Sequence, residues 1–100
     1  MSLSDAMPRL IEQITRQNPG TTQSGNTVDV TVNNQRAKSV ELNGKSPIVR
    51  DGAPIVERDW LVLVERGDGL FTSMIFICPA EDSQALRQTY EQMLGSFRAN

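Results

Sequence analysis

Two apolar runs on either side of an Asp-Gly turn constrain this chain more than any other feature. The runs are residues 60–65 and 70–78, both rich in β-branched and aromatic side chains, and Arg66-Gly67-Asp68-Gly69 lies between them. Aspartate and glycine accept the positive φ angles of a tight connection, so the pattern predicts a β-hairpin. Within the first run Trp60, Val62 and Val64 alternate with Leu61 and Leu63. Since both alternating sets are apolar, we expect a central strand that is covered on both faces.

The length and charge of the chain bound the possible functions. One hundred residues fit one domain, expected over residues 1–100, and Met1-Ser2-Leu3 is typical of a domain excised from a larger protein. The composition, 38% hydrophobic and 22% charged, is that of a globular domain. A net charge of −2 gives no electrostatic footprint for nucleic acid. No apolar run is long enough to span a bilayer, so membrane insertion by this segment is not expected.

A helix is predicted from Ser4 to Gln17. An apolar stripe at positions i, i+3, i+4 and i+7 supports it, formed by Met7, Leu10, Ile11 and Ile14. Ser4 is the expected N-cap, and Pro8 is expected in the first turn, where its missing N–H costs nothing. The sequence Asn18-Pro19-Gly20 is expected to end this helix.

Two alternating strands are predicted next, over residues 27–32 and 37–42, joined by a turn at Asn33-Asn34. In the second strand Val40 and Leu42 should face inward, and Lys38, Ser39 and Glu41 should be mostly exposed. Residues 21–26 and 43–54 read as loops, the second because prolines and glycines oppose regular structure. A short edge strand near Ile48 is the one exception expected within it.

A second amphipathic helix is predicted near the C-terminus. Pro79 should end the last strand, and Glu81 and Asp82 suit the positive end of a helix dipole. The apolar stripe that follows comprises Leu86, Tyr90, Met93, Leu94 and Phe97. We expect an α+β fold, a mostly antiparallel four- to five-stranded sheet with an N-terminal and a C-terminal helix. Its open edges should be residues 27–32 or the segment near Ile48, since the runs from Trp60 and Leu70 look central.

No residue pattern indicates a reaction, so we assign no catalytic, cofactor-binding or metal site and expect no cofactor. Histidine is absent, which removes the commonest general base and metal ligand. The single cysteine, Cys78, closes an apolar strand and is expected to be a buried small hydrophobe. Met74 and Met93 lie on apolar stripes and are expected in the core.

Three charged motifs have a simpler structural interpretation. The charges of Glu57-Arg58-Asp59 are expected to pair with neighbouring strands or with each other, although a charged site at the end of a strand is the alternative. The adjacent carboxylates of Glu81 and Asp82 are expected to complement a helix dipole. Arg66-Gly67-Asp68 matches a cell-adhesion tripeptide, but a hairpin turn already accounts for it.

The second half of the chain resembles a known family. The segments that carry the resemblance are Ser46-Pro47-Ile48 and residues 57–62, 76–81 and 90–98. Together they look like a non-catalytic C-terminal domain of some bacterial HtpX-like zinc metallopeptidases, over residues 27–98. Asn34 departs from that pattern, in which glycine is usual. The ending Met-Leu-x-Ser-Phe is shared with the broader PsbP/Mog1-like α/β/α sandwiches.

The resemblance implies an accessory domain. We expect a non-catalytic accessory or interaction domain of a larger bacterial protein, with a zinc metallopeptidase as one possible parent. The alternative is a PsbP-like small binding module that engages a protein complex or a small ligand, and a stand-alone enzyme is the least favoured interpretation. Another protein or other domains of the parent chain are the expected partners. The resemblance also implies an extracytoplasmic, periplasmic location, while the sequence does not indicate the oligomeric state.

Overall fold

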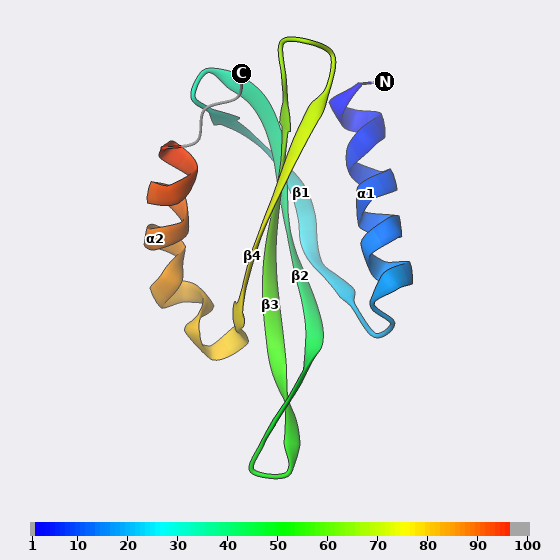
Figure 1. Cartoon of the computed structure of the whole chain (residues 1–100), viewed down its shortest axis with the longest axis vertical. Coiled ribbons are helices and arrows are strands. Elements are labelled where there is room, and N and C mark those ends of the chain that lie inside the picture. The colour runs from blue at the N-terminus through cyan, green and yellow to red at the C-terminus, as the bar shows by residue number, and fades with distance from the viewer. Residues whose placement is uncertain (1, 97–100) are drawn as a thin grey trace.

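The computed structural model describes residues 2–96 and, within them, the side chains of all but residues 46–50. Four strands form one sheet between two helices, which lie on opposite sides of it (Figure 1). The elements in chain order are α1 (Leu3–Gln17), β1 (Thr22–Val32), β2 (Gln35–Arg50), β3 (Ala53–Glu65), β4 (Phe71–Pro79), a 3₁₀ turn η1 (Ala80–Asp82) and α2 (Ser83–Gly95). The predicted α+β fold with an antiparallel sheet and two terminal helices is therefore confirmed.

The sheet is a meander with strand order β1-β2-β3-β4, each neighbouring pair antiparallel. The turn predicted at Asn33-Asn34 is present. Both residues have positive φ, 49° and 68°, which asparagine tolerates better than most residues. The turn predicted at residues 66–69 is also present, and the Arg66 amide donates to the carbonyl of Leu70 over 2.8 Å.

The loop predicted over residues 43–54 is wrong. β2 continues through it to Arg50, and the turn is confined to Asp51 and Gly52, with φ of 54° and 80°. Pairing with β3 overrides the local preference for a loop, since the ladder runs on through Lys45↔Val56 and resumes at Val49↔Pro54. The expected edge strand near Ile48 is thus part of β2, and the β2–β3 hairpin extends beyond the helices (Figure 1). β1 likewise begins at Thr22, earlier than predicted.

The core on the α1 side contains the predicted helical stripe. Met7 is fully buried, and Leu10, Ile11 and Ile14 pack against a cluster that includes Val40, Leu42, Leu61 and Leu63. Two details of α1 differ from the prediction. Ser2, not Ser4, caps the helix, and its side chain accepts a hydrogen bond from the Asp5 amide. Because α1 begins at Leu3, Pro8 lies beyond the first turn, where its ring removes one intrahelical hydrogen bond.

The core on the α2 side gathers around the even-numbered residues of β3. Trp60, Val62 and Val64 are buried there with Val32, Ala37 and Leu94, and Tyr90 packs against them. Met74 also packs against this cluster, but Met93 is 54% exposed, so its predicted place in the core is wrong. Phe97 of the predicted stripe lies outside the described residues.

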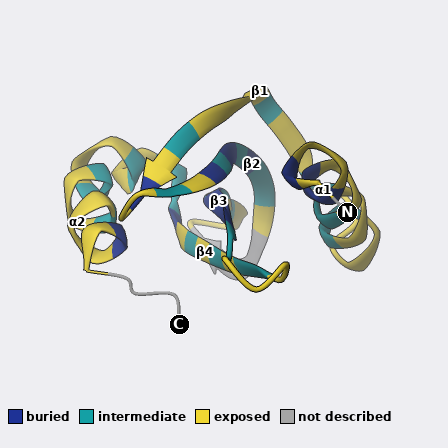
Figure 2. Ribbon diagram, turned by 90° about the horizontal axis from the view of Figure 1, so that it is seen from above, coloured by how far each residue is buried: buried dark blue, intermediate teal, exposed yellow. Residues whose placement is uncertain are grey.

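A helix covers each face of the sheet, and this explains why two residues of β2 are less exposed than predicted (Figure 2). Ser39 is buried and Glu41 is half-buried, although both were expected to be mostly exposed. α2 covers the face that these residues occupy, a relation that periodicity within one strand does not reveal. β3 is internal, as expected for the Trp60 run, but β4 forms an outer edge of the sheet opposite β1. The prediction that the Leu70 run is central is therefore wrong.

Candidate functional site

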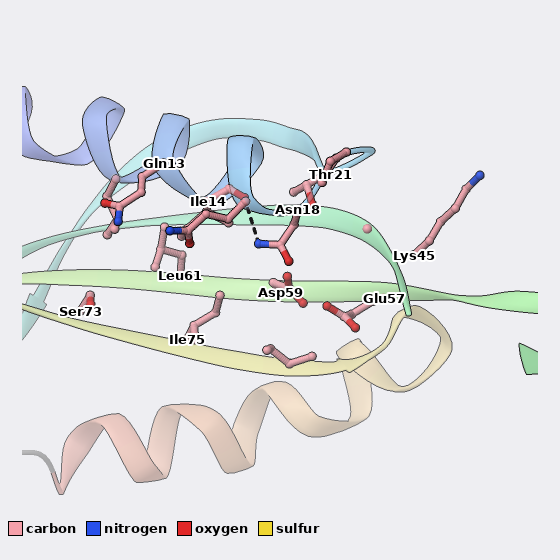
Figure 3. Close-up of a pocket in the computed structure, with 15 residues that line it drawn as sticks. Gln13, Ile14, Asn18, Thr21, Lys45, Glu57, Asp59, Leu61, Ser73 and Ile75 are labelled. Carbon is pink, nitrogen blue, oxygen red and sulfur yellow. Dashed lines mark hydrogen bonds between the residues drawn. The ribbon is translucent and has the colours of Figure 1, made fainter. Parts of the chain in front are cut away.

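A cavity of about 500 Å³ lies between the C-terminal half of α1 and the sheet (Figure 3). β3 forms its floor, β4 forms one wall, and the segment that follows α1 closes one end. The aliphatic residues that line it are Leu10, Ile14, Leu61, Ile75 and Ile77, and the polar ones include Gln13, Gln17, Asn18, Thr21, Lys45, Glu57, Asp59 and Ser73. The cavity therefore combines an aliphatic wall with a polar end.

Two carboxyl groups of β3 occupy the polar end. Glu57 and Asp59 are two residues apart in a strand, so their side chains project to the same face. Their carboxyl groups point into the same space beneath Asn18 (Figure 3). Asp59 is 7% exposed, and its Oδ1 atom has no hydrogen-bond partner. A buried polar atom without a partner is costly, and such atoms are few in native proteins.

The environment of Asp59 strongly favours its neutral form. Burial, followed by the hydrogen bond and the negative charge of Glu57, raises the pKa of Asp59 to about 7. Near neutral pH Asp59 therefore carries its proton in about half of the molecules. Lys45 lines the mouth, but its ammonium group points away from the carboxyl groups (Figure 3). Among the side chains that the structure describes, neither carboxyl group has an ion-pair partner.

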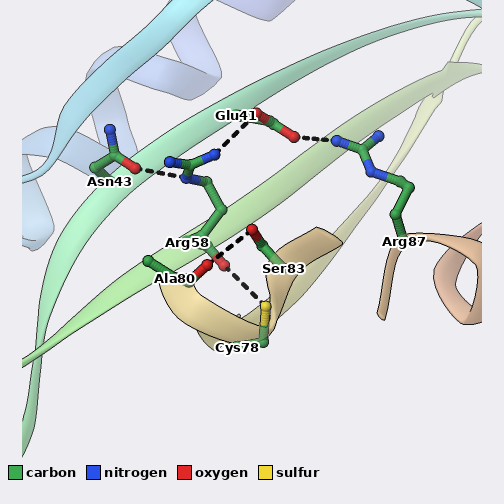
Figure 4. Close-up of polar contacts among 7 residues, drawn as sticks. All are labelled: Glu41, Asn43, Arg58, Cys78, Ala80, Ser83 and Arg87. Carbon is green, nitrogen blue, oxygen red and sulfur yellow. Dashed lines mark hydrogen bonds and ion pairs between the residues drawn. The ribbon is translucent and has the colours of Figure 1, made fainter. Parts of the chain in front are cut away.

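A different set of charged residues ties α2 to the sheet (Figure 4). Glu41 of β2 accepts from Arg58 of β3 over 3.2 Å and also pairs with Arg87 of α2. The Nε atom of Arg58 donates to the side chain of Asn43 over 2.6 Å. Every charged group in this set has a partner, so its role is structural.

The motif Glu57-Arg58-Asp59 is thus divided between the two faces. Arg58 pairs with the neighbouring strand as predicted. Glu57 and Asp59 project to the opposite face and form the polar end of the cavity. Their position agrees with the alternative prediction for this motif, a charged site at the end of a strand. A signal for this was present, because Asp59 continues the alternating set of Leu61 and Leu63, which is buried on that face.

The other residues for which the sequence suggested a role lie outside this cavity. Cys78 is buried, as predicted, and its thiol lies 3.8 Å from the carbonyl oxygen of Arg58. Burial, and then the nearby Cys78, raises the pKa of Tyr90 to about 12, so this phenol is neutral at physiological pH. Asp68 caps its own turn by accepting from the Leu70 amide, and Glu81 lies in η1 at the start of the C-terminal helical segment. No cluster of three or more acidic or cysteine ligands occurs in the part of the chain that the structure describes.

Comparisons with known proteins give one structural likeness. No protein-family model matches the chain, and a search of curated proteins gives no match. A crystal structure of the Pseudomonas aeruginosa protein PA94, of unknown function and described as a candidate regulator, has a TM-score of 0.71 and 15% identity. The likeness covers 99% of this chain and 63% of that one, so this chain spans less than two thirds of its neighbour's length. At this identity the likeness shows a shared fold. Among residues 2–96 no helix is long and apolar enough to cross a membrane.

Proposed function

We propose that this chain is a non-catalytic interaction domain of a larger bacterial protein, which recognises an extended segment of a partner along β4. The observation that supports the proposal is that this edge strand is uncharged and regularly paired on its inner side. Its nine residues, Phe71–Pro79, include no charged side chain, and they pair with β3 in an uninterrupted register. Proteins usually protect such edges with charges, bulges or covering elements, because an open edge invites another strand.

The exposed side chains of β4 support the same proposal. Ile75 and Ile77 are 43% and 56% exposed, although isoleucine is among the residues most often buried. Both project to the α1 face beside the cavity. A strand added to β4 would cover them with its own side chains, as in β-strand addition by peptide-binding domains.

The backbone of β4 offers free donors on its outer side. The Arg66 amide donates to Leu70, so this pair begins the ladder and the hydrogen-bonded pairs alternate from there. It follows that Ser73, Ile75 and Ile77 direct their amides away from β3. No described strand pairs with this side of β4.

The other edge of the sheet is less suited to strand addition. The register of β1 shifts between Ser24 and Val28, and Gly25 has a φ of 81° within that shift. Asp29 places a charge on the strand, paired with Lys38. A bulge and a charge are common protections of a strand edge. We therefore favour β4 over the β1 edge that the sequence suggested.

The alternative is a small binding module of the PsbP/Mog1-like type. The arrangement of helix, sheet and helix is compatible with that fold, and the cavity beneath α1 is the observation that favours a small ligand. The resemblance to the C-terminal domain of HtpX-like metallopeptidases makes such a peptidase one candidate parent protein. A His-Glu-x-x-His segment in the parent chain would support this assignment.

Strand addition can be tested with matched proline variants on the two edges. Ten-residue peptides selected from a random library for binding should slow amide exchange in β4. Ser73→Pro should abolish that binding because it removes an outward donor, whereas Thr31→Pro removes the equivalent donor from β1 and should leave binding intact. Both variants should fold, as judged by circular dichroism, since proline is tolerated where the N–H faces solvent. Ile75→Glu, which places a charge on the edge, provides a second test.

Three results would contradict the proposal. In the first, the selected peptides slow amide exchange only outside β4, and in the second, wild type and Ser73→Pro bind them equally. The third is turnover of ester or peptide probes by wild type that is lost in Asp59→Asn. The last of these would indicate an enzyme in place of an interaction domain.

A further inference from the structure

The carboxyl pair in the cavity lacks the partner that its charge requires. Asp59 is more than nine-tenths buried, lines the cavity and leaves Oδ1 without a hydrogen bond. Glu57, two residues earlier on the same face, adds a second carboxyl group and no positive charge. The cavity also lies at the C-terminal end of α1, the negative end of the helix dipole. These features all favour a cation.

The walls indicate what kind of cation fits. Ile14 and Leu61 line the space on the α1 and β3 sides, and Ile75 and Ile77 line it on the β4 side. An aliphatic chain of several carbons would pack against these side chains and carry its charged end to the carboxyl groups. The side-chain amides of Asn18 and Gln17, at the same end of the cavity, offer further oxygen acceptors.

We propose that this cavity binds a primary ammonium group on an aliphatic chain, with Asp59 and Glu57 as its acceptors. An ammonium group has three N–H donors, which suits two carboxyl groups and one amide oxygen. A divalent metal is less suited, because the described residues include no cluster of three acidic ligands. The ammonium group could belong to a free amine or to a lysine of a segment docked on β4. Binding of the free amine does not depend on strand addition.

Ammonium and the proton on Asp59 compete for the same carboxyl group, so binding should depend on pH. Burial and the charge of Glu57 raise the pKa of Asp59 to about 7. The fraction of Asp59 that is ionised therefore rises about tenfold between pH 6 and pH 8. The groups that face Asp59 from α1, β4 and residues 18–21 are uncharged, and Lys45 of β2 points its ammonium group away. Glu57 is thus the charged group that lies beside Asp59 in this space.

The test is a titration of the whole chain with n-butylammonium chloride at constant ionic strength and pH 8, followed by NMR. We expect shifts confined to the end of α1 and the middle of β3 and β4, with affinity about tenfold weaker at pH 6. Asp59→Asn and Glu57→Gln should each weaken binding at least about tenfold, the loss expected when a charged acceptor is removed. The matched control is Glu12→Gln, which removes one negative charge from the exposed face of α1, where Glu12 pairs with Arg16.

Two further ligands separate charge from hydrogen bonding. Equal binding of n-butanol would overturn the proposal by showing an apolar pocket, and equal binding of tetramethylammonium would overturn it by showing that N–H donors are not used. Unchanged binding in Asp59→Asn, or shifts that sodium chloride reproduces, would also overturn it.

A comparison of two peptides identifies the source of the ammonium group. A β-strand peptide with one central lysine is compared with the same peptide carrying norleucine. A preference for lysine that is lost in Asp59→Asn supports the proposal, with the partner as the source. If Ser73→Pro abolishes peptide binding but not n-butylammonium binding, both proposals stand. If n-butylammonium fails to bind while the norleucine peptide binds β4, the ammonium site alone is wrong.

Discussion

Arg87 lies over the indole ring of Trp60, with the guanidinium carbon 4.0 Å from the ring centroid. The same guanidinium group pairs with Glu41, which is the cross-strand neighbour of Trp60 on β2. A single residue of α2 thus contacts two strands of the sheet at once. Trp60 in turn packs against Phe76 of β4, with ring centroids 5.5 Å apart. Together these contacts connect α2 with β2, β3 and β4.

Arg87→Ala should lower the free energy of unfolding by about 1–2 kcal/mol, because a partly buried cation–π contact and an ion pair are lost together. Arg87→Lys should recover only part of this loss, since an ammonium group cannot stack on the ring and pair with Glu41 in the same planar geometry. Urea unfolding provides the measurement. The control is Arg16→Ala, which removes an exposed i,i+4 pair on α1 and should cost about 0.5 kcal/mol or less.

Trp60→Ala should destabilise the protein by about 3–5 kcal/mol, the usual cost of emptying a buried aromatic site. Trp60 is 7% exposed and belongs to the cluster of Val62 and Leu94, and its ring packs against Phe76, on which Tyr90 stacks. Chemical denaturation measures the effect. A loss below about 1 kcal/mol would mean that Trp60 contributes as a surface residue, which would contradict its buried position.

Stability should fall as the pH rises from about 5 to about 7.5, because of Asp59. Its pKa in the folded protein, about 7, is above the ordinary value of 3.8, so the folded state binds more protons than the unfolded state in this window. The loss should be on the order of 2–4 kcal/mol, from about 1.4 kcal/mol for each unit of pKa difference. The pKa of Asp29 is lowered by its hydrogen bond from Lys38, so its contribution is lost only under more acidic conditions.

Asp59→Asn is the control for this pH dependence. It should flatten the profile and make the protein more stable than wild type at pH 8, since a neutral amide replaces a buried charge. Urea unfolding of both proteins at pH 5 and pH 8 checks this. An unchanged slope in Asp59→Asn would assign the dependence to another group.

Ile77→Lys should place an internal ammonium group beside the carboxyl pair. Ile77 is the register partner of Asp59 on β4, and directly paired side chains in antiparallel strands lie within about 5.5 Å at Cβ. We expect a gain of about 1 kcal/mol at pH 8 relative to Ile77→Met, and a lower pKa for Asp59 in carbon-detected NMR. Val28→Lys, at a residue 55% exposed on the opposite edge, should change neither quantity. An Asp59 pKa that stays near 7 in Ile77→Lys would contradict the geometry of the cavity.

The sequence by itself determined the local elements of this protein. Alternation in β3 with apolar residues on both faces required two covering layers, and the stripes around Met7 and Tyr90 supplied them. The residues of the two sharp turns predicted from sequence tolerate positive φ, as at Asn33 and Gly69, so these hairpins could be predicted from local chemistry. Such features depend on neighbours within a few residues, which is why periodicity reveals them.

Only the tertiary structure decided the length of β2, the edge position of β4 and the environment of Asp59. The continuation of β2 to Arg50 depends on its register with β3, which outweighs the local turn signals. An uncharged apolar strand such as β4 fits the centre or the edge of a sheet equally well by its own pattern, so its position depends on strand order. The raised pKa of Asp59 depends on its burial in the folded chain and on the neighbouring Glu57. These properties arise between segments far apart in the chain, and the local sequence around each residue does not contain them.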